Sequence, residues 1–141
     1  MALEAAVADE TRRWLAKAER DLYAARTGMG ADPPLLDDAA FHCQQAVEKV
    51  LKAFLVGHGQ SFRKTHLLVE IGMQCVEVDS SLLLLVERVR PLTDYAWRFR
   101  YPGETEIPTE EEAKRALTIA EEVVAAVRDR LPLPTSDSSA S

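Results

Sequence analysis

The chain has 141 residues, of which 47% are apolar and 28% charged, and its formal net charge is −6. This length fits a single domain with one apolar core, and no apolar run approaches the ~20 residues that a membrane-spanning helix needs. The negative charge argues against nonspecific nucleic-acid binding, which requires cations clustered against phosphates. Good helix formers dominate and glycine is scarce, so the composition predicts an all-α fold.

Apolar residues recur with helical spacing in five stretches that glycine and proline separate. The predicted helices span roughly residues 11–29, 35–56, 65–78, 80–101 and 109–131. Ser80 or Ser81 is a plausible cap for the fourth helix, which Pro91 should bend or interrupt. The fifth helix has the clearest start, because Thr109 followed by Glu112 forms a capping-box pattern.

Short connections between amphipathic helices favour antiparallel neighbours. The sequence therefore predicts an up-down antiparallel bundle of four to five helices over residues 1–134, followed by a disordered polar tail at 135–141. The N-terminus shows no signal-peptide pattern. Cys43 and Cys75 form no CxxC pair and suggest no disulfide framework, so the expected location is the cytoplasm, away from any membrane.

Cations and one tyrosine are expected to gather at one pole of this bundle, where the second helix ends, the third begins and the fourth ends. These candidate ligand- or phosphate-binding residues are Lys52, Arg63, Lys64, His66, Arg98, Arg100 and Tyr101. A cation cluster in an acidic chain is a candidate phosphate or nucleotide site, since arginine presents a bidentate fork to phosphate. The alternative is structural, with the cations paired to acids such as Glu104, Glu106 and Glu110–Glu112.

The second predicted helix carries polar residues beside its apolar stripe. Glu48 and Lys52 have the spacing of a favourable ion pair, and Gln44 and Gln45 either bond across an interface or face solvent. His42 is expected to be a hydrogen-bonded structural histidine, because no second ligand lies one turn away on its helix. The sequence therefore predicts neither a metal site nor a cofactor.

Three stretches, in this order, carry a resemblance to a known family. They are WLAKAERDLYAA at 14–25, FHCQQAVEKVLKAFLV at 41–56 followed by KTHL at 64–67, and DYAWRFRYP at 94–102. Together they resemble the HEPN domain of prokaryotic proteins over roughly residues 10–131. The resemblance implies a helical bundle that is usually a homodimer, and many members are encoded beside a minimal nucleotidyltransferase as toxin–antitoxin or related pairs.

Other members of that family are metal-independent ribonucleases, whose signature is an arginine followed, after four to six residues, by a histidine behind the fourth helix. The matching arginines here are Arg98 and Arg100, and no histidine follows either of them. Because metal-independent cleavage needs a group that moves protons at neutral pH, the sequence assigns no catalytic residue. The expected function is a dimeric partner of a nucleotidyltransferase, with a nucleotide or RNA as a further ligand.

Two alternatives stay open at this point. One is a divergent ribonuclease that uses Arg98 or Arg100 together with Tyr101 or a histidine from elsewhere. The other is a helical interaction protein without a ligand.

Overall fold

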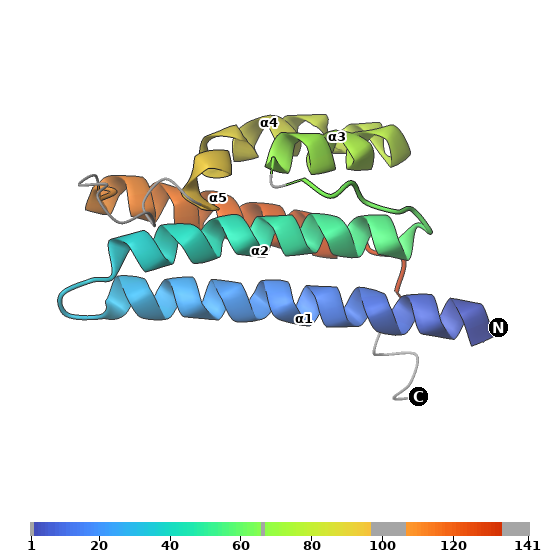
Figure 1. Cartoon of the computed structure of the whole chain (residues 1–141), viewed down its shortest axis with the longest axis horizontal. Helices are drawn as coiled ribbons and strands as arrows, with labels where there is room; N and C mark the ends of the chain where they lie inside the picture. Colours follow the sequence, from blue (N-terminus) through green and yellow to red (C-terminus); the bar gives the residue numbers. More distant parts are fainter. Residues whose placement is uncertain (1, 66, 97–106, 134–141) are drawn as a thin grey trace.

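The structure is a computed structural model that describes residues 2–65, 67–96 and 107–133. Its elements are α1 (Ala2–Gly30), α2 (Leu36–Gly57), α3 (Leu68–Val78), the 3₁₀ helix η1 (Ser80–Leu82), α4 (Leu83–Val89), the 3₁₀ helix η2 (Arg90–Ala96) and α5 (Glu110–Arg128). No strand occurs in the described ranges, so the predicted all-α bundle is confirmed (Figure 1). Within those ranges, no helix combines the length and apolarity that crossing a membrane requires. The predicted tail lies outside the described residues.

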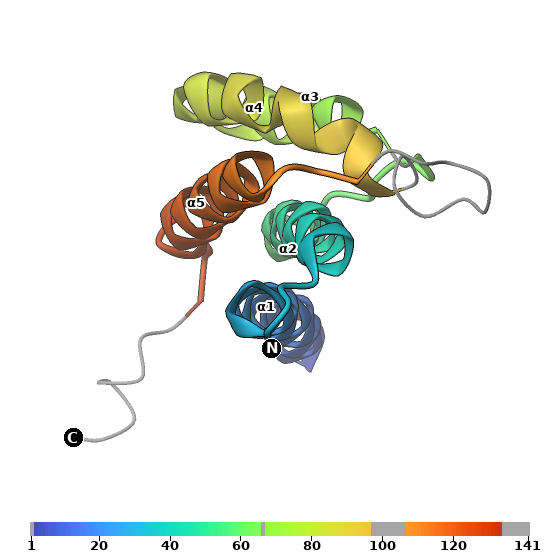
Figure 2. The ribbon, with the colours of Figure 1, turned by 90° about the vertical axis from the view of Figure 1, so that its left-hand side faces the viewer.

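Helix α2 lies at the centre of the bundle. It packs against α1, α3, α5 and η2, and the end-on view in Figure 2 places it between α1 and the α3–α4 pair, with α5 alongside. Its largest fully buried apolar side chains are Val47, Val50, Leu51, Phe54 and Leu55. Because neighbours cover α2 on several sides, polar residues of this helix are also removed from solvent, and these form the polar clusters described below.

Local sequence signals placed several helix boundaries correctly. Thr109 Oγ1 accepts the Glu112 backbone N–H at 3.0 Å, and the Glu112 carboxylate accepts the Thr109 N–H at 2.9 Å, so the predicted capping box is confirmed. The α-helical part of the fourth stretch ends at Val89, and the chain continues through Pro91 as a 3₁₀ helix. A proline has no backbone N–H to donate, which accounts for this predicted interruption.

Two boundaries differ from the sequence expectation. Helix α1 already begins at Ala2 rather than near Thr11, because the preceding residues are mostly alanine and glutamate, which favour helix. The cap before the fourth stretch is Asp79 rather than Ser80 or Ser81, since its carboxylate accepts bonds from the Ser81 N–H at 3.0 Å and hydroxyl at 2.7 Å. These bonds stabilise the ionised form and lower the pKa of Asp79.

The direction of α3 separates helix ends that were expected to meet. Helices α2 and α5 end together, because a Cβ at Gly57 would lie 3.0 Å from the Pro132 ring. The end of α3 reaches the same place, where Asp79 Oδ2 lies 3.9 Å from Arg130 Nε. Helices α2 and α3 therefore run in the same direction, and the connection 58–67 returns along the bundle between them (Figure 1).

The consequence is that α2 and η2 end at opposite ends of the bundle. Residues of η2, including Leu92 and Tyr95, share a hollow with Thr109 and Glu112 at the start of α5, not at its end. The expectation that the second and fourth helices end at one pole is therefore wrong. The physical reason is the length of the 58–67 connection, whose ten residues can span ~33 Å, about the length of α2 itself.

Candidate functional site

The structure describes three of the seven predicted ligand-binding candidates, Lys52, Arg63 and Lys64. His66, Arg98, Arg100 and Tyr101 lie outside the described residues. The expected grouping of all seven side chains therefore stays a prediction, and it no longer has the support of the shared helix ends.

Lys52 is held inside the fold rather than presented to a ligand. Its Nζ lies 3.1 Å from Glu48 Oε2, which confirms the predicted pair, and its side chain is only 16% exposed. The same ammonium group lies 5.3 Å from the centre of the Trp14 ring and 4.9 Å from the centre of the Phe62 ring. These two rings meet edge to face at 5.7 Å, so Lys52 joins α1, α2 and the 58–67 connection through a cation–π arrangement.

Arg63 and Lys64 occupy the connection that returns along the bundle, and both are exposed. The Arg63 backbone N–H donates to Gln74 Oε1 at 3.0 Å, and Gln74 Nε2 donates to the Ser61 carbonyl at 3.2 Å. These bonds fix the backbone of the connection on α3. Within the described part of the chain, neither cationic side chain has a hydrogen bond or an ion pair, so both remain available to a ligand or partner.

Within this chain, the side-chain bonds of the two glutamines of α2 stay on their own helix, and neither glutamine is fully exposed. Gln44 is fully buried and Gln45 is half-buried. Gln45 Nε2 donates to Gln44 Oε1 at 2.7 Å, and Gln44 Nε2 donates to Glu48 Oε1 at 3.4 Å. The bonds therefore run along α2 itself and connect to Lys52 through Glu48.

A second polar cluster joins α1 to α2 and was not anticipated from the sequence. Asp21 on α1 is buried, and each of its carboxylate oxygens has a partner on α2. Oδ1 lies 2.8 Å from His42 Nδ1, and Oδ2 accepts a bond from Lys49 Nζ at 2.5 Å. His42 and Lys49 are seven residues apart, two helical turns, so they lie on the same face of α2 and both reach the carboxylate.

His42 is hydrogen-bonded, as predicted, but it is not enclosed in the core. Its side chain is 32% exposed, whereas that of Asp21 is 10% exposed. The bond to Asp21 uses Nδ1 and orients the ring, and it does not involve the second ring nitrogen, Nε2. An imidazole oriented in this way by a carboxylate can bind an anion or transfer a proton.

The cluster opens onto a surface groove along the seam of α1 and α2, here called the seam groove. One half encloses about 310 Å³ and is lined by Lys17, Arg20, Asp21, Ala24, His42 and Lys49. The other half is an open surface depression of about 640 Å³ and shares Arg20, Ala24 and His42 with the first. Its remaining lining includes Tyr23, Leu35 and Asp38. The seam groove therefore has a cationic half and a half with an aromatic ring.

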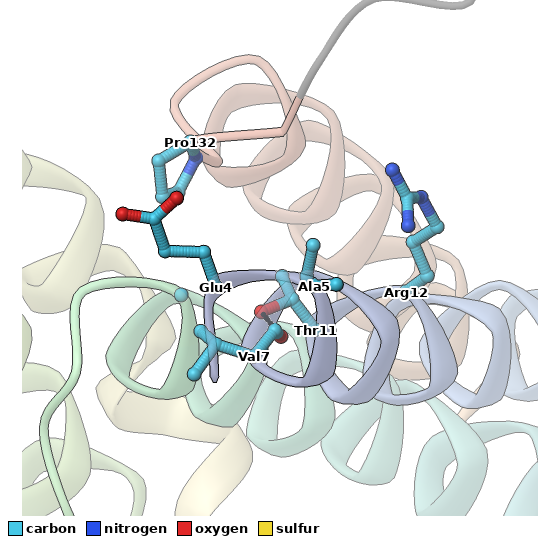
Figure 3. A pocket seen from close by; sticks show the side chains of 8 residues that line it. Glu4, Ala5, Val7, Thr11, Arg12 and Pro132 are labelled. Carbon is cyan, nitrogen blue, oxygen red and sulfur yellow. Dashed lines mark hydrogen bonds between the residues drawn. The ribbon is translucent and has the colours of Figure 1, made fainter. Parts of the chain in front are cut away.

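A separate hollow of about 640 Å³ lies where the start of α1 meets the ends of α2 and α5. Figure 3 shows Glu4 beside Pro132, with Arg12 further along α1. The hydroxyl of Thr11 at this hollow already donates to the Val7 carbonyl at 2.7 Å. One acid and one base flank an otherwise mainly apolar surface, so this hollow offers no cluster of polar groups for chemistry.

The cysteines contribute no reactive thiol to the described surface. Cys43 and Cys75 are free and fully buried, and burial raises the pKa of each thiol to about 12, with a further contribution from the charge of Glu121 at Cys43. No group of three or more histidine, cysteine or carboxylate side chains in the described ranges is arranged to hold a metal ion.

Comparison with known proteins finds one matching family model and one protein of similar sequence. A family model described as "HEPN domain" matches residues 11–130. The protein named "Putative toxin MJ1304" from Methanocaldococcus jannaschii is 29% identical over 133 residues, which cover 84% of this chain and 86% of that protein. No solved structure matches the chain.

Proposed function

Because the chain belongs to the HEPN domain family, we propose that it is a toxin-type HEPN protein that works together with a second protein. The observation that carries this proposal is the likeness to the protein named "Putative toxin MJ1304", which extends over most of both chains. A match of that extent relates whole domains rather than one shared motif. The described surface also retains unpaired cations, such as Arg63 and Lys64, that a partner or an RNA can contact.

The proposed partner is a minimal nucleotidyltransferase that acts as the antitoxin, and the proposed assembly contains a homodimer of this chain. Sequence resemblance motivates both expectations, since HEPN proteins are commonly dimeric and commonly paired with such an enzyme. The α3–α4 pair carries exposed apolar residues, including Met73, Leu83 and Leu84, which are suited to burial in a protein–protein interface. A two-fold dimer needs only one self-complementary patch of this kind.

Copurification tests the partnership. The chain, carrying an affinity tag, is coexpressed with the product of its neighbouring gene, which the proposal expects to be a nucleotidyltransferase, and the purified material is sized by light scattering. The proposal predicts a complex that contains both proteins and, for this chain alone, a dimer at micromolar concentration. A monomeric chain that fails to retain the nucleotidyltransferase contradicts it.

A second candidate function is a divergent ribonuclease, and the geometry of His42 makes it the candidate for the histidine from elsewhere in the chain that this function needs. Asp21 orients the imidazole beside Lys17, Arg20 and Lys49, which is the kind of setting that proton transfer near a phosphate needs. Cleavage of single-stranded RNA by the pure protein, lost in His42→Ala and retained in His58→Ala, would support this candidate. Absence of cleavage in the wild-type protein leaves the partner-based function as the account of the chain.

A further inference from the structure

We propose that the outer face of the α3–α4 pair is a docking surface for an amphipathic helix that carries basic residues. The outer face is the exposed side of these two helices, formed by Glu70, Met73, Glu77, Leu83, Leu84 and Glu87. This inference rests on the proposed function in one respect, since the helix is assigned to the partner protein that this function requires. Figure 2 shows the pair as an outer layer, on the opposite side of α2 from α1.

Exposed apolar side chains are concentrated on and beside this pair. Of the nine large hydrophobic side chains that are exposed in the described part of the chain, five fall between residues 67 and 84. Leu84 is the most exposed of them, at 79%, and Leu83 and Met73 are 43% and 40% exposed. Single exposed apolar residues are ordinary on a protein surface, whereas a concentration of them marks a surface that another protein covers.

The two helices form one continuous surface. Gly72 of α3 lies against Val86 of α4, since a Cβ added at Gly72 would be 2.7 Å from a γ-carbon of Val86. Met73 follows Gly72 on α3, and Leu83 lies one turn before Val86, so these two apolar side chains flank the point of closest approach. A third helix can lie along the seam of such closely packed helices, with its own apolar residues at positions i, i+3, i+4 and i+7.

Carboxylates flank the apolar residues. Glu70 and Glu77 lie one turn before and one turn after Met73, on the same face of α3. Neither carboxylate has a hydrogen bond or an ion pair with any described side chain. Glu87 on α4 pairs with Arg90 at 3.2 Å, but both side chains are more than half exposed, so water weakens this pair. The rim of the outer face therefore carries negative charge that lysine or arginine of a partner can neutralise.

The same carboxylates disfavour a second copy of this chain on the outer face. In a two-fold contact both copies present the same patch, so Glu70 and Glu77 of one copy approach those of the other. Like charges brought together in this way oppose association. The formal net charge of −6 adds to the repulsion between copies and to the attraction of a basic protein. The outer face is therefore assigned to a basic partner, and the expected homodimer to another surface.

The spacing of the acids defines the partner helix further. Glu70 and Glu77 are two helical turns apart, or ~10 Å along α3 at 1.5 Å per residue. A partner helix that lies along α3 reaches both carboxylates with two basic residues that are also seven positions apart. Helix α3 has 11 residues and a length of ~16 Å, so about three turns of the partner helix cover it.

Fluorescence anisotropy tests the surface with two labelled synthetic helical peptides as probes for the full chain. Both peptides carry leucine at positions i, i+3, i+4 and i+7. The basic peptide has lysine at two flanking positions seven residues apart, where the acidic peptide has glutamate. We expect the chain to bind the basic peptide at least about tenfold more tightly, because the rim carboxylates repel the acidic one. Equal binding of the two peptides, or no binding of the basic peptide, overturns the inference.

Two pairs of matched variants locate the binding of the basic peptide at physiological salt. Leu84→Ala should weaken it about fivefold or more, whereas Leu3→Ala, which truncates a 77% exposed leucine on α1, should leave it unchanged. Glu77→Lys should weaken it about tenfold, and Glu10→Lys, the same charge change at an exposed position on α1, much less. All four positions are exposed, so the variants should fold, and thermal melts verify this. Equal effects within either pair overturn the inference.

Copurification and light scattering then follow the partner and the dimer separately. Leu84→Asp, coexpressed with the proposed nucleotidyltransferase partner, should lose that partner and still form the dimer. Retention of the partner by wild type and by Leu84→Asp alike overturns the inference while the proposed function stands. Loss of the dimer in Leu84→Asp assigns the outer face to a second copy and also overturns it. A wild-type chain that retains no partner contradicts the proposed function, and the peptide titrations still decide whether the outer face binds a basic helix.

Discussion

Replacing Asp21 with asparagine should destabilise the fold by removing the charge that holds α1 to α2. Asp21 is 10% exposed and contacts both Lys49 and His42, so the substitution leaves a largely buried ammonium group without its counter-ion. Breaking a fully buried ion pair costs about 3–5 kcal/mol. Here the Lys49 side chain is 24% exposed and retains some water, so we expect a loss of about 2 kcal/mol in the free energy of unfolding, or ~8 °C in Tm.

A double-mutant cycle in urea isolates the interaction from other effects of the substitutions. Lys49→Met alone should cost about 1 kcal/mol, and the double variant about 2 rather than 3 kcal/mol, because the two changes remove the same pair. Glu121→Gln is the matched control. It breaks the ion pair with Arg26, whose side chain is 52% exposed, and should cost less than about 0.5 kcal/mol. Additive costs for Asp21→Asn and Lys49→Met would refute the reasoning.

Three further predictions concern the helices and the thiols. Thr109→Ala removes the cap of α5 and should lower the free energy of unfolding by about 1 kcal/mol in a urea titration, whereas Thr109→Ser should retain most of it. Gly72→Ala places a Cβ 2.7 Å from a γ-carbon of Val86, so it should lower the free energy of unfolding by about 1–2 kcal/mol. Adding Val86→Ala should relieve the clash. An unchanged free energy of unfolding in Gly72→Ala would show that α3 and α4 separate easily. With thiol pKa values of about 12, only roughly one thiol in ten thousand is ionised at pH 8. Cys43 and Cys75 should therefore react with Ellman's reagent only on unfolding or well above neutral pH. Rapid reaction of the native protein would contradict their burial.

The sequence predicted those features of the fold that depend on neighbouring residues. The capping box of Thr109 and Glu112 joins residues three apart, and the interruption at Pro91 follows from one missing N–H. The pairing of Glu48 with Lys52 was predictable for the same reason, because both lie on one helix four residues apart. Each of these depends on local geometry that the helical repeat alone defines.

The Asp21 cluster could not be predicted in this way. Its two bonds join residues 21 and 28 positions apart, and the helical period of α2 does not say which residue of α1 opposes a given face. A signal was present, since His42 and Lys49 share a face beside the apolar stripe, but that spacing also fits a solvated surface. The direction of α3 was missed for a different reason, because a ten-residue connection permits either direction.

Growth of cells on induction tests the proposed function most directly. The chain is expressed from an inducible promoter, alone and together with the proposed nucleotidyltransferase partner, and culture density and viable counts are followed after induction. The account predicts that the chain alone arrests growth and that coexpression of the nucleotidyltransferase restores it. Normal growth with the chain alone at a verified protein level, or arrest that the nucleotidyltransferase does not relieve, would contradict the account.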